Sequence, residues 1–585
     1  MVAKAKTGDV LDMNLLRRVL KFASPYKYQF LLGTIAAFAL SFLGPLRPVL
    51  INYAIDNYIL FPNSEKLLQI TYLLIFLLII EGIVQFYYIF LSTWIGQHVI
   101  QDLRSITFKH ILSLKMRYFD RTQIGTLVTR TVSDIETIAD IFSQGLLVIL
   151  AELLKLIVVI VMMFYTDWRL AIISLLTIPV LLVATSWFKR NIKKAFQQVR
   201  EQVSILNAFV QEHIVGMNIV QIFNREKAEF EKFKLINKSH RDAHLRSIFY
   251  YAVFFPIVEV LSAISIGLII WYGGESILAG KSVTLGELVA FILFIHMMFR
   301  PIRQLADRFN ILQMGIVGSE RVFRLLDTDE KISDSNTRDI CNLSGSINFS
   351  DVHFSYNDHE WVLKGISFDV KSGNLLAIVG STGAGKTSVI NVLNRFYEIQ
   401  KGSISIDNIN INKIPLAYLR SNIALVQQEV FLFSEPILHN ITLYDKQLTF
   451  DKVKIAAKEI GVHDFIMSLP GGYNYIPGER GVTLSAGQRQ LIAFLRVYIR
   501  DPKILVLDEA TSSIDTVTEE LLQHALHKLS NDRTTIVIAH RLSTIINADK
   551  ILYLNDGVVI EKGNHEELMQ KQDSYYKMFK SQVRL

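Results

Sequence analysis

Long apolar segments dominate the first half of this chain and limit the folds open to it. A helix needs about 20 apolar residues to cross a hydrocarbon core of roughly 30 Å. Six segments meet this length, the last by merging into a longer, more polar helix. They centre on residues 30–50, 67–89, 146–164, 170–188, 253–272 and 285–298. The sequence therefore predicts a bundle of six transmembrane helices.

The composition agrees with a protein that lies partly in lipid. Of the 585 residues, 51% are hydrophobic, which is too many for an ordinary soluble protein. The formal net charge is +7, but the Lys and Arg residues cluster beside the apolar segments, so we expect no nucleic-acid partner. The one cysteine, Cys341, rules out a disulfide framework and a cysteine-based metal site.

Cations near the first apolar segment set the expected orientation. Arg17, Arg18, Lys21 and Lys27 precede it, which places the N-terminus in the cytoplasm by the positive-inside rule. An even number of spans returns the C-terminal half to the same side. The first 11 residues are polar and lack the apolar core of a cleaved signal, so membrane entry is expected to depend on the later helices.

The links between the apolar segments are unequal. Those at 52–66, 166–169 and 273–284 are short and poor in cations. Those at 97–145 and 189–247 are long, rich in Lys and Arg and helical in pattern, so we expect them to continue the spans into the cytoplasm. Within them, residues 118–125 and 216–225 either turn against the second half of the chain or form solvated hairpins, and the sequence favours neither reading.

Charged residues inside the apolar segments are costly and usually face a cavity or a partner. Glu152 and Lys155 are three apart on a helix, where they can neutralise each other. Each of the other charged residues could equally line a cavity or pair with a charge inside the protein. The set comprises Glu81, Glu152, Lys155, Glu259 and Arg300, with His296 as a titratable neighbour.

A glycine-rich loop follows a strand-like segment at 375–379 and predicts a site for a nucleoside triphosphate. Glycines let successive N–H groups converge on one anion, and the following helix N-terminus adds its dipole. In this pattern Lys386 neutralises the outer phosphates and Thr387 holds Mg²⁺. The predicted phosphate-binding residues are Gly380, Ser381, Thr382, Gly383, Ala384, Gly385, Lys386, Thr387 and Ser388.

Two carboxylates at the end of a second apolar strand support this prediction. The segment 504–507 reads as a buried strand that delivers Asp508 and Glu509 beside the phosphate loop. Asp508 can hold Mg²⁺ and Glu509 can polarise the attacking water, which suits a reaction that depends on positioning and on neutralising charge. An acidic pair after a strand is often a helix cap, but the upstream loop favours the catalytic reading.

A third motif makes the sequence resemble the ATP-binding cassette (ABC) family. The pentad Leu484-Ser485-Ala486-Gly487-Gln488 is close to the family signature LSGGQ and lies just before the strand that ends in Asp508. The resemblance covers essentially the whole chain and is to an exporter half-transporter. It implies an all-α six-helix transmembrane domain followed by an α/β P-loop ATPase domain. The expected division is a 1–27 N-terminal segment, a 28–325 transmembrane domain, a 326–346 linker and a 347–585 nucleotide-binding domain.

The resemblance also implies roles for single residues. Tyr356 looks like the aromatic residue that stacks on adenine, and Gln428 like the loop glutamine that reaches Mg²⁺ and the attacking water. His540 resembles the switch histidine at the γ-phosphate, and Asp515 the residue that crosses to a partner cassette. Gln427 stands where the family commonly has proline, and the segment 479–481 resembles the one that meets the cytoplasmic extensions.

The signature further implies a dimer. In the family, the signature of one cassette, here Ser485, Ala486, Gly487 and Gln488, closes over ATP and Mg²⁺ held by the other. A homodimer is the leading hypothesis, for an ATPase that exports an amphipathic, lipid-like or drug-like compound across the cytoplasmic membrane. Ala486 replaces a glycine, and alanine would cost roughly 1 kcal/mol if the position needs positive φ. This motivates a heterodimer as an alternative, beside an ATP-gated channel on the same fold.

Overall fold

The computed structural model describes residues 13–280, 283–332, 334, 342–357, 360–508, 516–539 and 542–583. The chain forms two compact units. One comprises Met1–Leu112 with Ile124–Thr328, and the other comprises Ser113–Gln123 with Asp329–Leu585. We call them the membrane unit and the cassette. The domain division predicted from the sequence remains a prediction, and the contacts differ from it in grouping 113–123 with the cassette.

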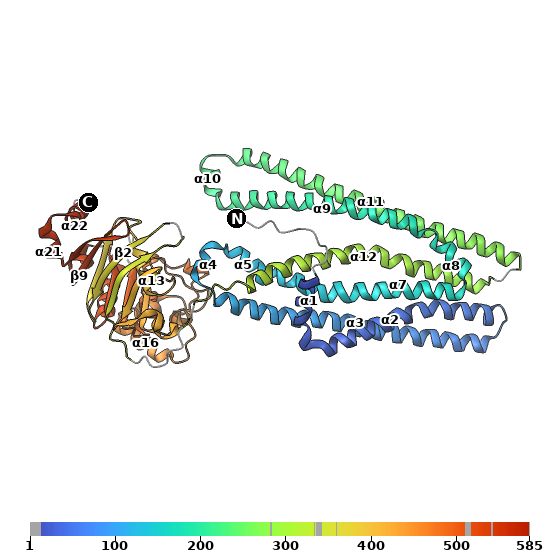
Figure 1. The fold of residues 1–585 in the computed structure, drawn as a ribbon, viewed down its shortest axis with the longest axis horizontal. Coiled ribbons are helices and arrows are strands. Elements are labelled where there is room, and N and C mark those ends of the chain that lie inside the picture. The colour runs from blue at the N-terminus through green and yellow to red at the C-terminus, as the bar shows by residue number, and fades with distance from the viewer. Residues whose placement is uncertain are drawn as a thin grey trace. The chain divides into compact units, whose positions relative to one another are not determined.

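The membrane unit is helical throughout its described part (Figure 1). Five of its helical stretches in the described residues are long and apolar enough to cross a bilayer, and the sixth predicted segment lies within α12. The predicted fold class is therefore confirmed. The helices are α1 (Met13–Phe22), α2 (Lys27–Ala54), α3 (Ser64–Leu112), α5 (Ile124–Thr131), α6 (Ser133–Asp140), α7 (Leu147–Thr166), α8 (Trp168–Leu175), α9 (Ile178–Val215), α10 (Met217–Ile222), α11 (Glu226–Leu278) and α12 (Leu285–Leu326).

The long predicted links are helical, as expected. α3 runs on from its apolar part to Leu112, and α9 and α11 lie side by side beyond theirs, joined through α10 (Figure 1). His213 on α9 contacts Glu229 on α11 at 2.9 Å and ties the two extensions together. The structure differs from the prediction at 273–284, because α11 continues to Leu278. The fourth predicted segment is also divided, since α8 ends just before the turn that leads into Pro179.

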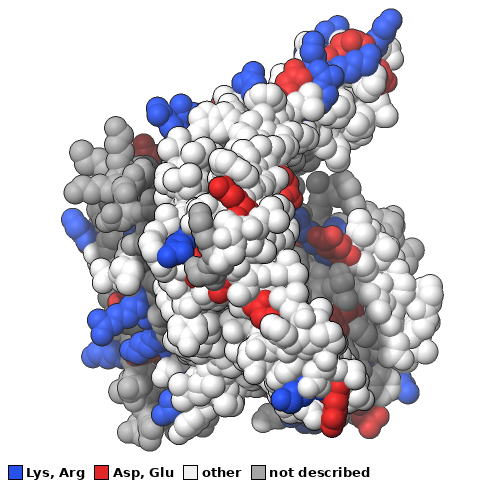
Figure 2. Space-filling view, turned by 90° about the vertical axis from the view of Figure 1, so that its right-hand side faces the viewer, with Lys and Arg blue, Asp and Glu red and all other residues white. Residues whose placement is uncertain are grey.

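Helices of the bundle meet through small and aromatic residues. The Ser265 hydroxyl donates to the carbonyl of Ser174 at 3.1 Å, and both residues are buried. Phe188 stacks on Phe254 at 4.2 Å in the apolar core. Many large apolar side chains point outward instead, as expected for a lipid-facing surface. Figure 2 shows the face on the right-hand side of Figure 1, where uncharged residues make up most of the described surface in view.

Two sheets build the cassette. The six-stranded sheet has the order β10-β9-β3-β8-β7-β6, and its neighbours pair in parallel except for β9 with β10. The four-stranded sheet, β2-β1-β4-β5, is antiparallel. The strands are β1 (Ile347–Phe354), β2 (Leu363–Val370), β3 (Leu375–Gly380), β4 (Lys401–Ile406), β5 (Ile409–Asn410), β6 (Ile423–Val426), β7 (Ile504–Asp508), β8 (Thr534–Ile538), β9 (Lys550–Asn555) and β10 (Val558–Gly563).

Helices cover both faces of the six-stranded sheet, which is why its central strands are buried. Alternate strand residues enter two different cores: Ala377 and Val379 of β3 join one, whereas Leu376 and Ile378 join the other. The cassette helices are α4 (Met116–Arg121), α13 (Lys386–Leu393), α14 (Leu416–Asn422), α15 (Ile437–Thr442), α16 (Phe450–Glu459), α17 (His463–Ser468), α18 (Ala486–Tyr498), α19 (Thr516–Ser530), α20 (Leu542–Ile546), α21 (His565–Lys571) and α22 (Ser574–Val583).

A carboxylate fastens the chain that enters the cassette. Asp407, after β4, accepts hydrogen bonds from the amides of Ser344, Gly345 and Ser346 at 2.6, 3.1 and 2.9 Å. The hydroxyls of Ser344 and Ser346 donate to it as well, at 2.5 and 2.8 Å. Partial burial alone would raise the pKa of Asp407, but these donors outweigh burial and lower it to about 2.

We predict that Asp407→Asn destabilises the cassette by about 1 kcal/mol at pH 7, a value reduced from that of a buried charged hydrogen bond because the site is partly exposed. The ionised carboxylate stabilises the fold above the unfolded-state pKa of about 3.9, and this contribution disappears as the pH falls toward 2. The unfolding temperatures of the wild type and of Asp407→Asn should therefore converge in acid.

Asp556→Asn is the control, because that turn residue pairs only with Lys364, at 2.9 Å, in the part of the chain described. An equal effect of both substitutions would contradict the prediction.

Candidate nucleotide site

The phosphate loop joins β3 to α13, and its glycines are required by its geometry. Gly380 has φ +150°, and a Cβ there would lie 2.1 Å from the carbonyl oxygen of Leu554 on the neighbouring strand. Gly385 has φ +97°, and a Cβ would lie 2.9 Å from Leu363. Gly385 is the N-cap of α13 and supplies no capping side chain, so the first N–H groups of this helix are left for an anion.

Lys386, which the sequence predicts to bind phosphate, is the first residue of α13. Its ammonium donates to the carbonyls of Gly380 and Ser381 at 2.7 and 2.9 Å, and the residue is buried. Burial lowers the pKa of Lys386, and the nearby charge of Asp508 partly opposes this shift. A buried cation held by two carbonyl dipoles is suited to receive the negative charge of a triphosphate.

The parallel sheet places the ends of the strands that precede several predicted residues at one edge. β7 lies between β6 and β8, and β8 pairs with β3, so the carboxyl ends of these strands are neighbours. Asp508 ends β7, and Gln428 follows β6 by two residues and is exposed. Thr387 is exposed in the first turn of α13. Glu509, Asp515 and His540, which follow β7 and β8 in the sequence, lie outside the described residues.

Tyr356 packs against the helix that begins with the phosphate loop. Its hydroxyl lies 3.1 Å from the Ser388 hydroxyl and accepts a hydrogen bond from the Asn391 amide at 3.0 Å. The ring is half-buried and meets Phe354 edge-on at 4.7 Å. These contacts fix the position of Tyr356 beside the loop. Its predicted stacking on adenine stays a prediction.

The signature residues begin α18. Ser485 is the N-cap and forms a capping box with Gln488: its hydroxyl accepts from the Gln488 amide at 3.2 Å, and the Gln488 side chain accepts from the Ser485 amide at 3.0 Å. Ser485 and Ala486 are exposed, whereas Gly487 is buried. Ala486 is the first helical residue and does not have positive φ, so the condition under which alanine would be strained is not met.

The two helices whose starts are predicted to bind phosphate lie on opposite faces of the sheet. Val389 and Ile390 of α13 pack in the core that contains Ile378 of β3. Leu491 and Phe494 of α18 pack in the other core, with Ala377 and Val379. Within one cassette, the sheet therefore separates the phosphate-loop helix from the signature helix.

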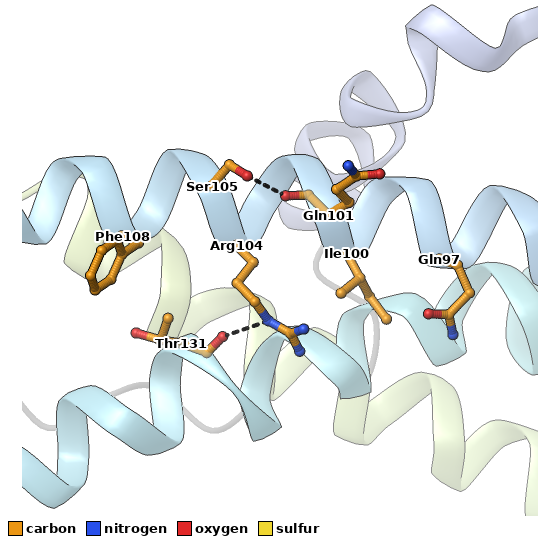
Figure 3. A pocket seen from close by; sticks show the side chains of 7 residues that line it. All are labelled: Gln97, Ile100, Gln101, Arg104, Ser105, Phe108 and Thr131. Carbon is orange, nitrogen blue, oxygen red and sulfur yellow. Dashed lines mark hydrogen bonds between the residues drawn. The ribbon is translucent and has the colours of Figure 1, made fainter. Parts of the chain in front are cut away.

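The membrane unit contains a pocket that is separate from the predicted nucleotide-binding residues. A pocket of about 510 Å³ lies between α3 and α5 (Figure 3). Arg104 crosses it and donates to the carbonyl of Thr131 at 3.4 Å, and it also faces Glu136 at 3.5 Å. The lining residues are Gln97, Ile100, Gln101, Arg104, Ser105, Phe108 and Thr131. None of them belongs to the nucleotide-site prediction.

One charge in the bundle has a partner that the sequence analysis missed. Glu81 on α3 forms an ion pair with Arg47 on α2. Arg47 lies inside the first predicted span, so the rule that singled out Glu81 could have found it. Lys155 lies nearby, since a Cβ at Gly44 would lie 3.7 Å from Lys155 and 3.8 Å from Glu81.

Comparison with known families identifies both halves of the chain. Residues 30–302 match the ABC transporter transmembrane region, and residues 363–512 match the ABC transporter family. The chain belongs to the ABC transporter family. It joins a membrane domain and an ATP-binding domain in one half-transporter, and its activity is ATPase coupled to transport.

Several relatives match along most of their length. The uncharacterized ABC transporter ATP-binding protein YknV of Bacillus subtilis (strain 168) is 36% identical over 568 residues, covering 97% of this chain and 94% of that protein. The ATP-dependent lipid A-core flippase of Syntrophus aciditrophicus (strain SB) is 33% identical over 573 residues, covering 98% and 95%. YheH of Bacillus subtilis, a probable multidrug resistance ABC transporter ATP-binding/permease protein, is 37% identical over 496 residues, covering 83% and 72%.

We predict that Ala486→Gly leaves ATP turnover within about twofold of wild type, because a residue at a helix start gains nothing from the freedom of glycine at positive φ. Stability should fall by up to about 0.5 kcal/mol. Steady-state ATPase assays and thermal unfolding of the full chain test both points. Gly487→Ala is the contrasting variant, because Gly487 is buried. A tenfold gain in turnover for Ala486→Gly would show that alanine hinders this site.

Proposed function

We propose that this chain acts as a homodimeric exporter in which two copies share two ATP sites and move an amphipathic, lipid-like or drug-like compound across the cytoplasmic membrane. The observation that carries the proposal is the separation of α13 and α18 on opposite faces of one sheet. A single cassette cannot bring both helix ends to one γ-phosphate. A second cassette facing the first can supply the missing end.

Each predicted residue has a defined task in this proposal. The phosphate loop and Lys386 hold the β- and γ-phosphates, and Tyr356 supports the base through its π-face. Glu509 orients the attacking water, and His540 contacts the γ-phosphate. Residues of the partner's signature, beginning with the exposed Ser485, close the site with a hydroxyl and a helix N-terminus. Asp515 contacts the partner cassette.

The oxygen ligands available fit Mg²⁺. Thr387 supplies a hydroxyl, Asp508 a carboxylate and Gln428 an amide oxygen, which are the hard ligands that this ion prefers. The described residues contain no group of three or more His, Cys, Asp or Glu side chains that could hold a metal ion on their own. This suits Mg²⁺, which is commonly bound by one or two side chains together with substrate phosphates. The ion would neutralise charge on the γ-phosphate.

The compound exported is inferred from the bundle and from the relatives. Few charges lie within the spans, and Arg47 and Glu81 neutralise each other. A largely apolar path suits an amphipathic compound better than an ion or a sugar. Among the relatives, one is named a lipid A-core flippase and another a multidrug resistance transporter. With Ala486 unstrained, the observation that motivated an obligate heterodimer no longer supports it.

We predict that Glu509→Gln retains ATP binding but lowers turnover by at least about a hundredfold, because the variant loses the group that polarises water. ATP binding and phosphate release by the full-length protein in lipid vesicles provide the measurement. Asp445→Asn is a control for charge loss elsewhere in the cassette. Turnover at the wild-type rate in Glu509→Gln would remove Glu509 from its assigned role.

We predict that nucleotide brings Ser485 of one copy close to the phosphate loop of the other. The protein tested carries Cys341→Ser and Glu509→Gln together with Ser485→Cys and Thr382→Cys. When ATP is added, the two new cysteines should cross-link between chains. The pair Ser581→Cys and Thr382→Cys is the control, with Ser581 exposed on α22. Denaturing gel electrophoresis separates cross-linked dimers from monomers. Full ATP turnover by isolated monomers would contradict the shared site.

A further inference from the structure

The segment 113–123 is fastened to the rest of the cassette at several points. The Lys115 amide donates to the carbonyl of Glu330 at 2.8 Å, and Leu114 forms a β-bridge with Lys331. The Lys115 ammonium pairs with Glu398 at 2.9 Å. The segment around α4 therefore meets the rest of the cassette at residues 397 and 398, a few residues after α13.

Tyr397 contacts α4 on one side and Tyr356 on the other. Its hydroxyl donates to the carboxylate of Asp120 in α4. Its ring meets that of Tyr356 edge-on, with centroids 5.0 Å apart and planes at 87°, and it also meets Phe354 at 5.7 Å. Burial, followed by the hydrogen bond to Asp120, raises the pKa of Tyr397 well above its usual range. Tyr397 thus stays a neutral donor at physiological pH.

Tyr356 in turn is held by the helix that follows the phosphate loop. Its hydroxyl contacts Ser388 at 3.1 Å and Asn391 at 3.0 Å, both on α13. Packed contacts therefore run without a gap from α13 through Tyr356 and Tyr397 to Asp120. A shift of the Tyr356 ring would press on Tyr397, because its other aromatic neighbour, Phe354, is a fully buried strand residue.

We infer that Tyr397 is a positioning residue through which the base of a bound nucleotide, resting on Tyr356, orders α4. The inference builds on the proposed nucleotide site and adds a residue to it. A base that stacks on Tyr356 restricts this ring, and the edge-on contact transfers the restriction to Tyr397. The hydroxyl of Tyr397 then holds Asp120. The signal depends on the purine and not on the phosphates, which the loop before α13 would hold in the proposed site.

The experiment measures hydrogen–deuterium exchange in full-length protein in lipid nanodiscs, with magnesium ATP or magnesium tripolyphosphate, which lacks the base. In wild type, ATP is expected to slow exchange in 113–123 at least about fivefold, the size of a modest coupling between sites. Tripolyphosphate should protect only the phosphate loop. In Tyr397→Phe, which keeps the ring contact and removes the hydroxyl, ATP should still protect the loop but no longer 113–123.

A matched control and a second variant complete the test. Tyr498→Phe removes another cassette hydroxyl that donates to a carboxylate, that of Glu459 at 3.0 Å, and should behave as wild type. Asp120→Ala cuts the same link from the α4 side and should reproduce Tyr397→Phe, with the affinity for ATP within about twofold of wild type. Because the two changes remove one interaction, their effects on 113–123 should not add.

The outcomes separate this inference from the proposed function. Protection of 113–123 by ATP in Tyr397→Phe, or equal protection by tripolyphosphate in wild type, would overturn the role of Tyr397 and leave the nucleotide site standing. Failure of ATP to protect the phosphate loop in wild type would overturn the nucleotide site itself, and the inference with it.

Discussion

The nucleotide chemistry of this chain depends on the parallel pairing of β6, β7, β8 and β3. Parallel strands end at one edge of a sheet, so side chains placed directly after them meet even when they are more than a hundred residues apart in sequence. The close approach of Gly380 to Leu554 shows how tightly this edge is built, because any side chain at Gly380 would collide with the neighbouring strand. The sheet therefore determines where the site forms. A glycine at position 380 allows β3 and the loop after it to approach the neighbouring strand this closely.

The same sheet also underlies the proposal that two chains build each site. A sheet covered on both faces buries its central strands, but it also divides its helices into two sets that cannot meet. α13 belongs to one set and α18 to the other. The capping box at Ser485 and Gln488 orders the start of α18, where Ser485 is exposed. In the proposed dimer, this preformed helix end closes the nucleotide site of the other copy.

Local sequence patterns predicted much of the fold, whereas contacts between residues far apart in the sequence could not be predicted. The apolar segments gave the spans, and the glycine-rich loop gave Lys386 and Thr387, because each depends on neighbours in sequence. The pairing of Arg47 with Glu81, and of Tyr397 with Asp120, depends on how helices and loops pack, which no periodicity records. Ala486 shows a third case: its backbone conformation follows from the capping box beside it, a signal that was present in the Ser485-to-Gln488 spacing.

Prolines place the expected bending points of two long helices of the membrane unit in or near the predicted spans. The 53 residues of α11 correspond to about 80 Å, far more than the roughly 30 Å of a hydrocarbon core. Proline removes an intrahelical hydrogen bond and is where a helix bends most easily. Pro256 of α11 lies in a predicted span, and Pro301 of α12 just beyond one, whereas the extension of α11 before residue 253 contains no proline. A bend in α11 is therefore expected in its predicted span and not in the proline-free extension before it.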